Sequence, residues 1–193
     1  MDEAFQVAYK GLLTRLKENK EGAQTNLQND EELRNAAERI GIAAIKYYDL
    51  KQSRISDYKF EYEKMLDFKG NTAVYLIYSY VRLCSILNKS GLNETSFKEL
   101  AVKGFKITHP HERLLAILVS KFPETIDQVI EELEIHKLCD FIYNLAVKIA
   151  EGYSKYRILD DPNRDTRILL CEVMRRIMKN CFFLVGIEPI ERI

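Results

Sequence analysis

The sequence has no tryptophan, only four cysteines and four prolines among 193 residues, and no long apolar run. No stretch approaches the roughly 20 apolar residues that cross a bilayer, so we expect no membrane-spanning helix. The first six residues are acidic and lack an apolar segment, which argues against a signal peptide. The cysteines form no CxxC pair, which disfavours a zinc ribbon or a disulfide scaffold and favours reduced, buried thiols in a cytoplasmic protein. They are Cys84, Cys139, Cys171 and Cys181.

The charges balance overall, with 29 basic and 29 acidic side chains, but they are unevenly distributed along the chain. Residues 69–113 carry a net charge of +4 and residues 146–193 a net charge of +2, whereas residues 114–145 between them carry −4. If the two basic segments pack side by side, a neutral molecule gains a positive face that could attract nucleic acid. The alternative is that these charges only solvate helix faces.

The hydrophobic pattern is helical almost throughout, so the predicted fold class is all-α. The strongest helix is expected over about 72–89, after a loop at 69–72 that ends in a good N-cap. Ser96 with Glu99 predicts a capping box for the next helix. Pro110 predicts a helix start, with the helix running to Phe122 and another beginning near Pro123. Further helices are predicted over about 138–157 and over a last segment carried by Leu170 to Leu184, which Gly186 ends.

One short segment departs from this pattern. Tyr58, Phe60 and Tyr62 alternate as in a short extended piece, which weakly indicates a strand.

No catalytic motif is present. The sequence lacks GxxxxGK[ST], GxGxxG, HExxH and GxSxG, so neither a catalytic residue nor a metal ligand is predicted. His109 and His111 flank Pro110, but no cysteine or carboxylate cluster completes a metal site around them. We interpret this His-Pro-His as a structural helix start.

The 72–89 helix has a second face beside its apolar stripe. Aromatic and cationic residues recur along this face at spacings of three and four, which places them in one line. Tyrosine rings can stack on unpaired bases while arginine and lysine hold phosphates, as a reader of single-stranded RNA requires. The same tyrosines could instead pack against a neighbouring helix. The residues in line on the 72–89 helix are Asn71, Tyr75, Tyr78, Arg82, Ser85 and Lys89.

A second cluster of aromatic and cationic residues, Tyr153, Tyr156 and Arg157, is open to the same two interpretations.

Several long segments resemble the class I arginyl-tRNA synthetases. They are residues 46–54 (KYYDLKQSR), 57–60 (DYKF), 69–82 (KGNTAVYLIYSYVR), 138–146 (LCDFIYNLA), 167–172 (RILLCE) and 186–193 (GIEPIERI). The resemblance implies that residues 69–193 form a helical bundle of the anticodon-binding type. It also implies that residues 1–68 are the last helices of a catalytic domain. Neither the HIGH-type nor the KMSKS-type motif of a class I synthetase is present, so we expect this chain alone to be inactive.

The resemblance also assigns roles to individual residues. In the family, the helix after the GNTA-type motif presents tyrosines and an arginine to the tRNA, which match Tyr75, Tyr78 and Arg82. A tyrosine that ends a later helix contacts the anticodon loop and matches Tyr153. The last residue of the chain reaches the anticodon as well; it is typically methionine in the family and is Ile193 here. Lys89 and Arg157 complete the predicted tRNA-binding set through their charge.

The function that the resemblance implies is the anticodon-binding part of an arginine–tRNA ligase, which charges tRNA(Arg) using ATP. The expected partners are tRNA(Arg) and the missing catalytic domain, in a cytoplasmic monomer without membrane contact. ATP with magnesium serves the full-length enzyme, and no cofactor is expected in this chain. Two alternatives stay open: a helical protein-interaction module whose tyrosines act as hot spots, and the anticodon-binding domain of another synthetase.

Overall fold

The computed structural model describes residues 6, 9–11, 13–14, 30–104 and 106–192, and every regular element in these ranges is a helix. The predicted all-α class is therefore confirmed. None of the helices in the described ranges is long and apolar enough to cross a bilayer. The helices are α2 (Asp30–Leu50), α3 (Tyr62–Met65), α4 (Ala73–Ser90), α5 (Glu94–Lys103), α6 (Pro110–Ser120), α7 (Phe122–Glu132), α8 (His136–Lys155) and α9 (Arg164–Leu184).

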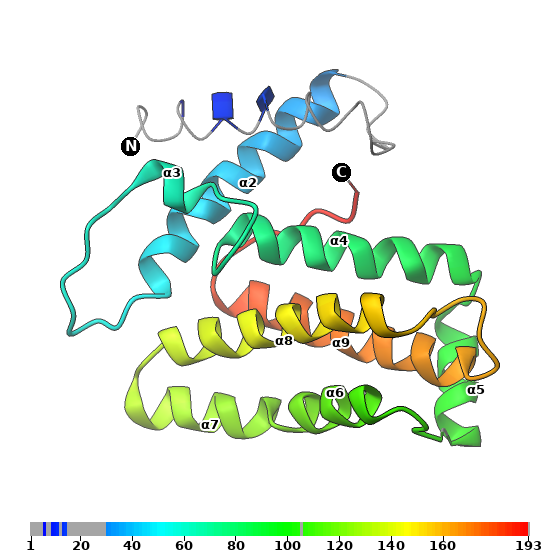
Figure 1. Ribbon diagram of the computed structural model, residues 1–193. Helices are drawn as coiled ribbons and strands as arrows, with labels where there is room; N and C mark the ends of the chain where they lie inside the picture. The colour runs from blue at the N-terminus through cyan, green and yellow to red at the C-terminus, as the bar shows by residue number, and fades with distance from the viewer. Residues whose placement is uncertain (1–5, 7–8, 12, 15–29, 105, 193) are drawn as a thin grey trace.

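Helices α4, α8 and α9 form the centre of the bundle (Figure 1). Helix α4 packs on both α8 and α9, while α6 and α7 cover the side of α8 that faces away from α4. Helix α5 closes one end of the bundle against α9. Helix α2 crosses the other end and contacts α4 and α8. The two basic segments therefore do pack together, since α4 belongs to the first, and the second half of α8 and all of α9 belong to the second.

A single hydrophobic core runs through these helices and includes α2. Ala37 and Tyr47 of α2 are 0% exposed and Ile40 is 2% exposed. The Tyr47 hydroxyl lies 2.6 Å from Oδ1 of Asn71 and 2.9 Å from the carbonyl oxygen of Cys139 on α8. Helix α2 is thus joined to the start of α4 and to α8 by burial and by polar contacts.

The ends of α4 agree with the sequence prediction. Thr72 is the N-cap, and its side chain accepts a hydrogen bond from the backbone N–H of Tyr75 at 3.2 Å. At the other end, Gly91 takes the left-handed conformation with φ of +70°, which a glycine adopts without steric strain. These caps determine where the helix starts and stops, and hence which side chains share each face.

Two predicted helix boundaries were wrong. Helix α5 is capped by Asn93, whose side chain accepts from the backbone N–H of Ser96 at 3.0 Å, so Ser96 lies inside the helix instead of capping it. Helix α6 ends at Ser120 instead of continuing to Phe122. Pro123 has no N–H to donate to the carbonyl of Val119, so a continuous helix is interrupted there and α7 begins as a separate element.

The predicted extended piece at Tyr58–Tyr62 is not a strand. Residues 57–61 have no regular structure, and Tyr62 begins α3. The aromatic rings alternate because they pack edge to face, with Phe60 5.2 Å from Tyr48 and 5.0 Å from Tyr62 between ring centroids. The alternation of aromatic residues that resembled a strand therefore reflects rings that pack against α2 and against one another.

Residues 185–192, called the tail, leave α9 at Gly186, whose φ is +67°. The tail folds back along the molecule (Figure 1), with Val185, Ile187 and Ile190 buried. Two long side chains of α2 hold its backbone: Lys46 Nζ donates to the carbonyl of Gly186 at 2.7 Å, and Arg39 Nη2 donates to that of Pro189 at 2.9 Å. The predicted role of Gly186 as helix terminator is confirmed, while Ile193 lies outside the described residues.

Candidate nucleic-acid interface

The predicted aromatic and cationic line on α4 lies on the side of the helix that is turned away from α9. Tyr78 is 51% exposed, and Arg82 and Lys89 are exposed along the same face. Tyr75 and Ser85 of this line are partly buried. The apolar stripe of α4, including Leu76, is buried in the core. The face available to a partner therefore consists mainly of one tyrosine ring and two cations.

Tyr75 is fixed against α8. Its ring meets the ring of Tyr143 edge to face, with centroids 5.9 Å apart and planes at 64°. Burial first, and then the nearby Tyr143, raise the pKa of the Tyr75 hydroxyl above its ordinary value. Tyr143 was not among the residues predicted from sequence. It lies one residue after Ile142 of the buried α8 stripe, where a large aromatic residue could have indicated a contact with α4.

Arg82 and Tyr153 form one unit. The Arg82 guanidinium carbon lies 3.9 Å from the centroid of the Tyr153 ring, within the range of a cation–π contact. The Tyr153 hydroxyl is buried with no hydrogen-bond partner among the described atoms, and this burial raises its pKa. One face of the Tyr153 ring is thus covered by Arg82. This arrangement holds the guanidinium in place while Arg82 itself stays exposed.

Arg157 is exposed on the loop between α8 and α9, and a buried charge cluster holds this loop. The carbonyl of Arg157 accepts from Nη1 of Arg167 at 2.5 Å. Arg167 in turn forms ion pairs with Glu112 at 2.6 Å and with Asp161 at 2.7 Å. The ring of Tyr156 lies over the same guanidinium at 4.4 Å. Tyr156 is therefore used inside the fold, which supports the packing interpretation for this member of the second cluster.

Glu112 and Arg167 were not predicted from sequence. Burial alone would raise the pKa of Glu112, but hydrogen bonds from Arg167 and from the backbone of His109 and Thr108 outweigh it and lower the pKa. The available signal was Glu112 itself, which stands three residues after the N-cap of α6, where a capping box places a carboxylate.

The two neighbouring histidines are structural, as predicted. His109 is the N-cap of α6 and its side chain accepts from the backbone N–H of His111 at 3.1 Å. His111 is 2% exposed, and its Nε2 lies 3.6 Å from a carboxylate oxygen of Glu151. Within the described ranges, no group of three His, Cys, Asp or Glu side chains could hold a metal ion.

The charges around the interface are partly compensated. Glu151 lies 2.7 Å from Lys148 and 3.5 Å from Lys155, which neutralises some of the positive charge of α8. By contrast, Arg82, Lys89 and Arg157 are exposed and form no ion pair with any described residue. Cations without an ion-pair partner can bind phosphates. The exposed ring of Tyr78 can stack on a base.

Comparison with known families gives two matches that together cover most of the chain. Residues 76–193 match the family described as the DALR anticodon binding domain. Residues 1–62 match the family described as tRNA synthetases class I (R), catalytic domain.

Individual relatives agree with both matches. The chain is 38% identical over 194 residues to an arginine–tRNA ligase of Nostoc punctiforme, covering 100% of this chain and 32% of that protein. It is 39% identical over 163 residues to a chloroplastic/mitochondrial arginine–tRNA ligase of Arabidopsis thaliana, covering 84% of this chain and 25% of that protein. The chain therefore spans between a quarter and a third of the length of these relatives.

Solved structures resemble the described fold as well. The crystal structure of arginyl-tRNA synthetase from Plasmodium falciparum superimposes with a TM-score of 0.83 at 33% identity, over 100% of this chain and 32% of that chain. The arginyl-tRNA synthetase of Thermus thermophilus gives the same TM-score at 24% identity, which supports the fold alone.

Proposed function

This chain belongs to the DALR anticodon-binding family, and its first residues match a class I arginyl-tRNA synthetase catalytic domain, so we propose that it binds the anticodon loop of tRNA(Arg). The observation that carries the proposal is the exposed Tyr78 beside Arg82, whose guanidinium rests on Tyr153. The relatives named arginine–tRNA ligase support arginine tRNA as the substrate.

The geometry supports different contacts for the tyrosine and for the cations of this face. Tyr78 stacks on an unpaired base, a contact that contributes about 1–3 kcal/mol. Arg82 directs its N–H groups to a phosphate or a base edge, since the Tyr153 ring beneath restricts its motion. Lys89 lies two turns along the helix, about 10 Å away, where the next phosphate could be held. Arg157 supplies a further cation from the loop that Arg167 holds.

We further propose that residues 69–193 hold the RNA and that residues 1–68 come from the catalytic part. Tyr75 contributes the edge of its ring, and Ile193 is proposed to make an apolar contact at the end of the chain. Deleting Arg192 and Ile193 should then lower tRNA affinity without changing thermal stability. Equal affinity would leave the end of the chain without a role in binding.

The ligase activity belongs, in this proposal, to a longer protein. ATP and magnesium would be bound by the catalytic part of such a protein. The residues of this chain do not fit such a site, because the sequence has neither nucleotide motif and the described residues offer no metal cluster. We therefore assign no step of ATP chemistry to this chain. Arginine-dependent exchange of pyrophosphate into ATP by the purified chain would contradict this.

The test of the proposal is the affinity of the chain for tRNA(Arg) and for one non-cognate tRNA at two salt concentrations. Tyr78→Ala and Arg82→Ala should each weaken binding, by about 1–3 kcal/mol for a lost stack. The Arg82 variant should also lower the salt dependence by about one released counterion. Lys64→Ala is the matched control, because this exposed lysine lies on α3, outside the α4 face.

The outcome separates the alternatives. If the variants bind tRNA as tightly as the unaltered chain and remain folded, the tyrosines only pack within the protein or serve another partner. A protein-interaction module would show little salt dependence, whereas RNA binding falls steeply with salt through counterion release. Equal competition by the non-cognate tRNA would favour the anticodon-binding domain of another synthetase.

We also propose that the protein is a cytoplasmic monomer. A cytoplasmic arginine–tRNA ligase of Arabidopsis thaliana, 37% identical over 163 residues, supports the compartment, as do four buried free thiols. Cell fractionation and sedimentation would test both statements. Recovery in an organelle fraction, or a mass twice that of the chain, would contradict them.

A further inference from the structure

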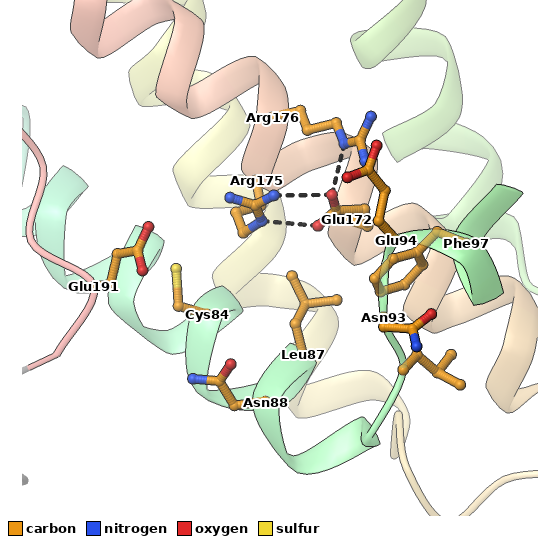
Figure 2. A pocket seen from close by; sticks show the side chains of 11 residues that line it. Cys84, Leu87, Asn88, Asn93, Glu94, Phe97, Glu172, Arg175, Arg176 and Glu191 are labelled. Carbon is orange, nitrogen blue, oxygen red and sulfur yellow. Dashed lines mark hydrogen bonds and ion pairs between the residues drawn. The ribbon is translucent and has the colours of Figure 1, made fainter.

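A pocket of about 250 Å³ opens between α4, α5, α9 and the tail, away from the tyrosine face (Figure 2). Its apolar floor consists of Cys84, Leu87 and Phe97. Leu87 and Tyr78 are nine residues apart, which is two and a half helical turns, so they lie on opposite sides of α4. The pocket is therefore separate from the contacts proposed above. It is also smaller than the roughly 300–1,000 Å³ of sites for drug-sized ligands.

One wall of the pocket is a pair of arginines held by a buried carboxylate. Glu172 is 5% exposed and accepts from Nε and Nη2 of Arg175 at 2.8 Å each, and from Nε of Arg176 at 2.6 Å. Burial alone would raise the pKa of Glu172, but the hydrogen bonds from both arginines outweigh it and lower the pKa. Glu172 therefore stays ionised and fixes the orientation of the two guanidinium groups.

Arg176 keeps hydrogen-bond donors for a ligand. Only its Nε is used by Glu172, so both terminal nitrogens are left with no hydrogen-bond partner among the described residues. The side chain is 54% exposed at the rim of the pocket. A planar guanidinium with two parallel donors is suited to a pair of adjacent acceptors.

Glu191 supplies the complementary acceptors. It stands on the tail, at the left of Figure 2. Cys84 lies between it and the other two floor residues, Leu87 and Phe97. Its carboxylate forms no ion pair within the described ranges. With Glu94 and Glu172 it brings the pocket lining to three carboxylates against two guanidinium groups. Because the carboxylates outnumber the guanidinium groups, the lining disfavours an anion such as a phosphate. It favours a neutral ring that both donates and accepts hydrogen bonds.

We propose that this pocket binds a guanine base turned out of the RNA that the chain holds, an inference that rests on the proposed function. Guanine carries two adjacent acceptors, O6 and N7, which match the fork of Arg176. Its N1–H and exocyclic amino group form a pair of donors, which match the carboxylate of Glu191. Leu87 and Phe97 cover the ring, as apolar and aromatic side chains do for splayed-out bases. Adenine lacks the O6 acceptor, cytosine lacks the pair of adjacent donors, and uracil lacks both pairs.

The test uses two heptanucleotides, UUUGUUU and UUUUUUU, with fluorescence polarisation as the measurement. The guanine-containing strand should bind the unaltered chain about tenfold tighter, the effect of one good bidentate contact. Replacing guanine by 7-deazaguanine removes an acceptor, and replacing it by hypoxanthine removes the exocyclic amino group. Each replacement should lower the affinity for the unaltered chain several-fold.

The variants assign each edge of the base. The Arg176→Gln variant should bind the guanine and 7-deazaguanine strands equally well but still bind guanine more tightly than hypoxanthine. The Glu191→Gln variant should bind the guanine and hypoxanthine strands equally well but still bind guanine more tightly than 7-deazaguanine. The matched controls are Lys179→Gln, which removes an exposed cation of α9 outside the pocket, and Glu188→Gln, which removes an exposed carboxylate of the tail. Both controls should retain the full preference. Equal binding of the two heptanucleotides, or a preference that survives both pocket variants, would overturn the proposal.

Guanosine monophosphate as a free probe separates this proposal from the proposed function. It should shift the side-chain Nε–H resonances of Arg175 and Arg176, whereas uridine monophosphate should not. If tRNA binds while these resonances do not respond to the nucleotide, the pocket inference fails alone. If the nucleotide shifts them while no tRNA binds, the proposed function fails alone. Shifts produced equally by a lysine-rich peptide would point to a protein ligand and overturn the guanine assignment.

Discussion

His111 is a titratable group enclosed by the fold, 2% exposed, near the junction of α6 and α8. Its Nδ1 lies 3.4 Å from the hydroxyl of Tyr156, and Glu151 lies beside its Nε2. Desolvation is the main cause that lowers its pKa below the ordinary 6.5, and the charge of Lys155 adds to it. Glu151 acts in the opposite direction without reversing the shift. The folded protein therefore holds His111 neutral.

This predicts a loss of stability in mild acid. Below about pH 6.5 the unfolded chain takes up a proton at this histidine more readily than the folded chain does, so the free energy of unfolding should fall as the pH drops. Glu112 and Glu172 also have lowered pKa values, but their contributions are lost only below the ordinary carboxylate value of 4.5. Urea unfolding between about pH 5 and about pH 7.5 separates the two windows.

The controls for this prediction are two histidine variants. His111→Gln should lower the stability overall and flatten its dependence on pH in that range. His136→Gln, at the partly exposed start of α8, should leave the dependence in place. An unchanged slope in the His111 variant would contradict the assignment.

At the scale of single residues, the sequence predicted which side chains of α4 are exposed better than it predicted which side chains contact one another. The exposure of Tyr78, Arg82 and Lys89 followed from helical periodicity, because a line at spacings of three and four falls beside the apolar stripe. The stacking of Arg82 on Tyr153 could not be predicted, since 71 residues separate them and only the packing of α4 on α8 brings them together.

At the scale of single helices, α5 depends on its N-cap. Asn93 accepts from the backbone N–H and from the hydroxyl of Ser96, both at 3.0 Å. The prediction placed the cap at Ser96 because Ser96 and Glu99 have the spacing of a capping box. In the structure Asn93, three residues earlier, is the N-cap of this ten-residue helix.

Asn93→Ala should therefore lower the free energy of unfolding by about 1 kcal/mol, because one backbone N–H at the start of α5 loses its acceptor. Ser96→Ala should have a smaller effect, since it removes no backbone acceptor. Equilibrium urea unfolding of both variants provides the measurement, and Ser120→Ala at the end of α6 serves as the control. A larger effect for Ser96 than for Asn93 would show that the cap is misassigned.

At the scale of the whole molecule, α2 unites the two family matches. It lies within the segment that matches a catalytic domain, yet seven of its apolar residues are buried in the same core as α4, α8 and α9. The proposed boundary near residue 69 therefore does not divide the hydrophobic core. The motifs around that residue were recognisable in sequence, whereas the packing of α2 against α4 arises only in the folded molecule. The seven are Ala36, Ala37, Ile40, Ala43, Ala44, Tyr47 and Tyr48.

A chain that starts at residue 69 should therefore fail to fold cooperatively. Exposing the surface that these residues cover would cost on the order of 10 kcal/mol, comparable to the total stability of a typical domain. A chain that starts at residue 30 should keep a cooperative thermal transition, because it retains α2. Circular dichroism and the dispersion of amide resonances would distinguish the two chains. A cooperative transition in the shorter chain, at the same temperature, would contradict this view of α2.

The hydrogen bonds between α2 and the tail also determine how the molecule would respond to force. Lys46 is bonded to Gly186 and Arg39 to Pro189, so the tail runs antiparallel to α2 and the free ends of both point the same way. Pulling residue 30 away from residue 192 in an optical trap would load these bonds one after the other, the Arg39 bond first. The molecule would then open by unzipping, at lower force than if both bonds were sheared together.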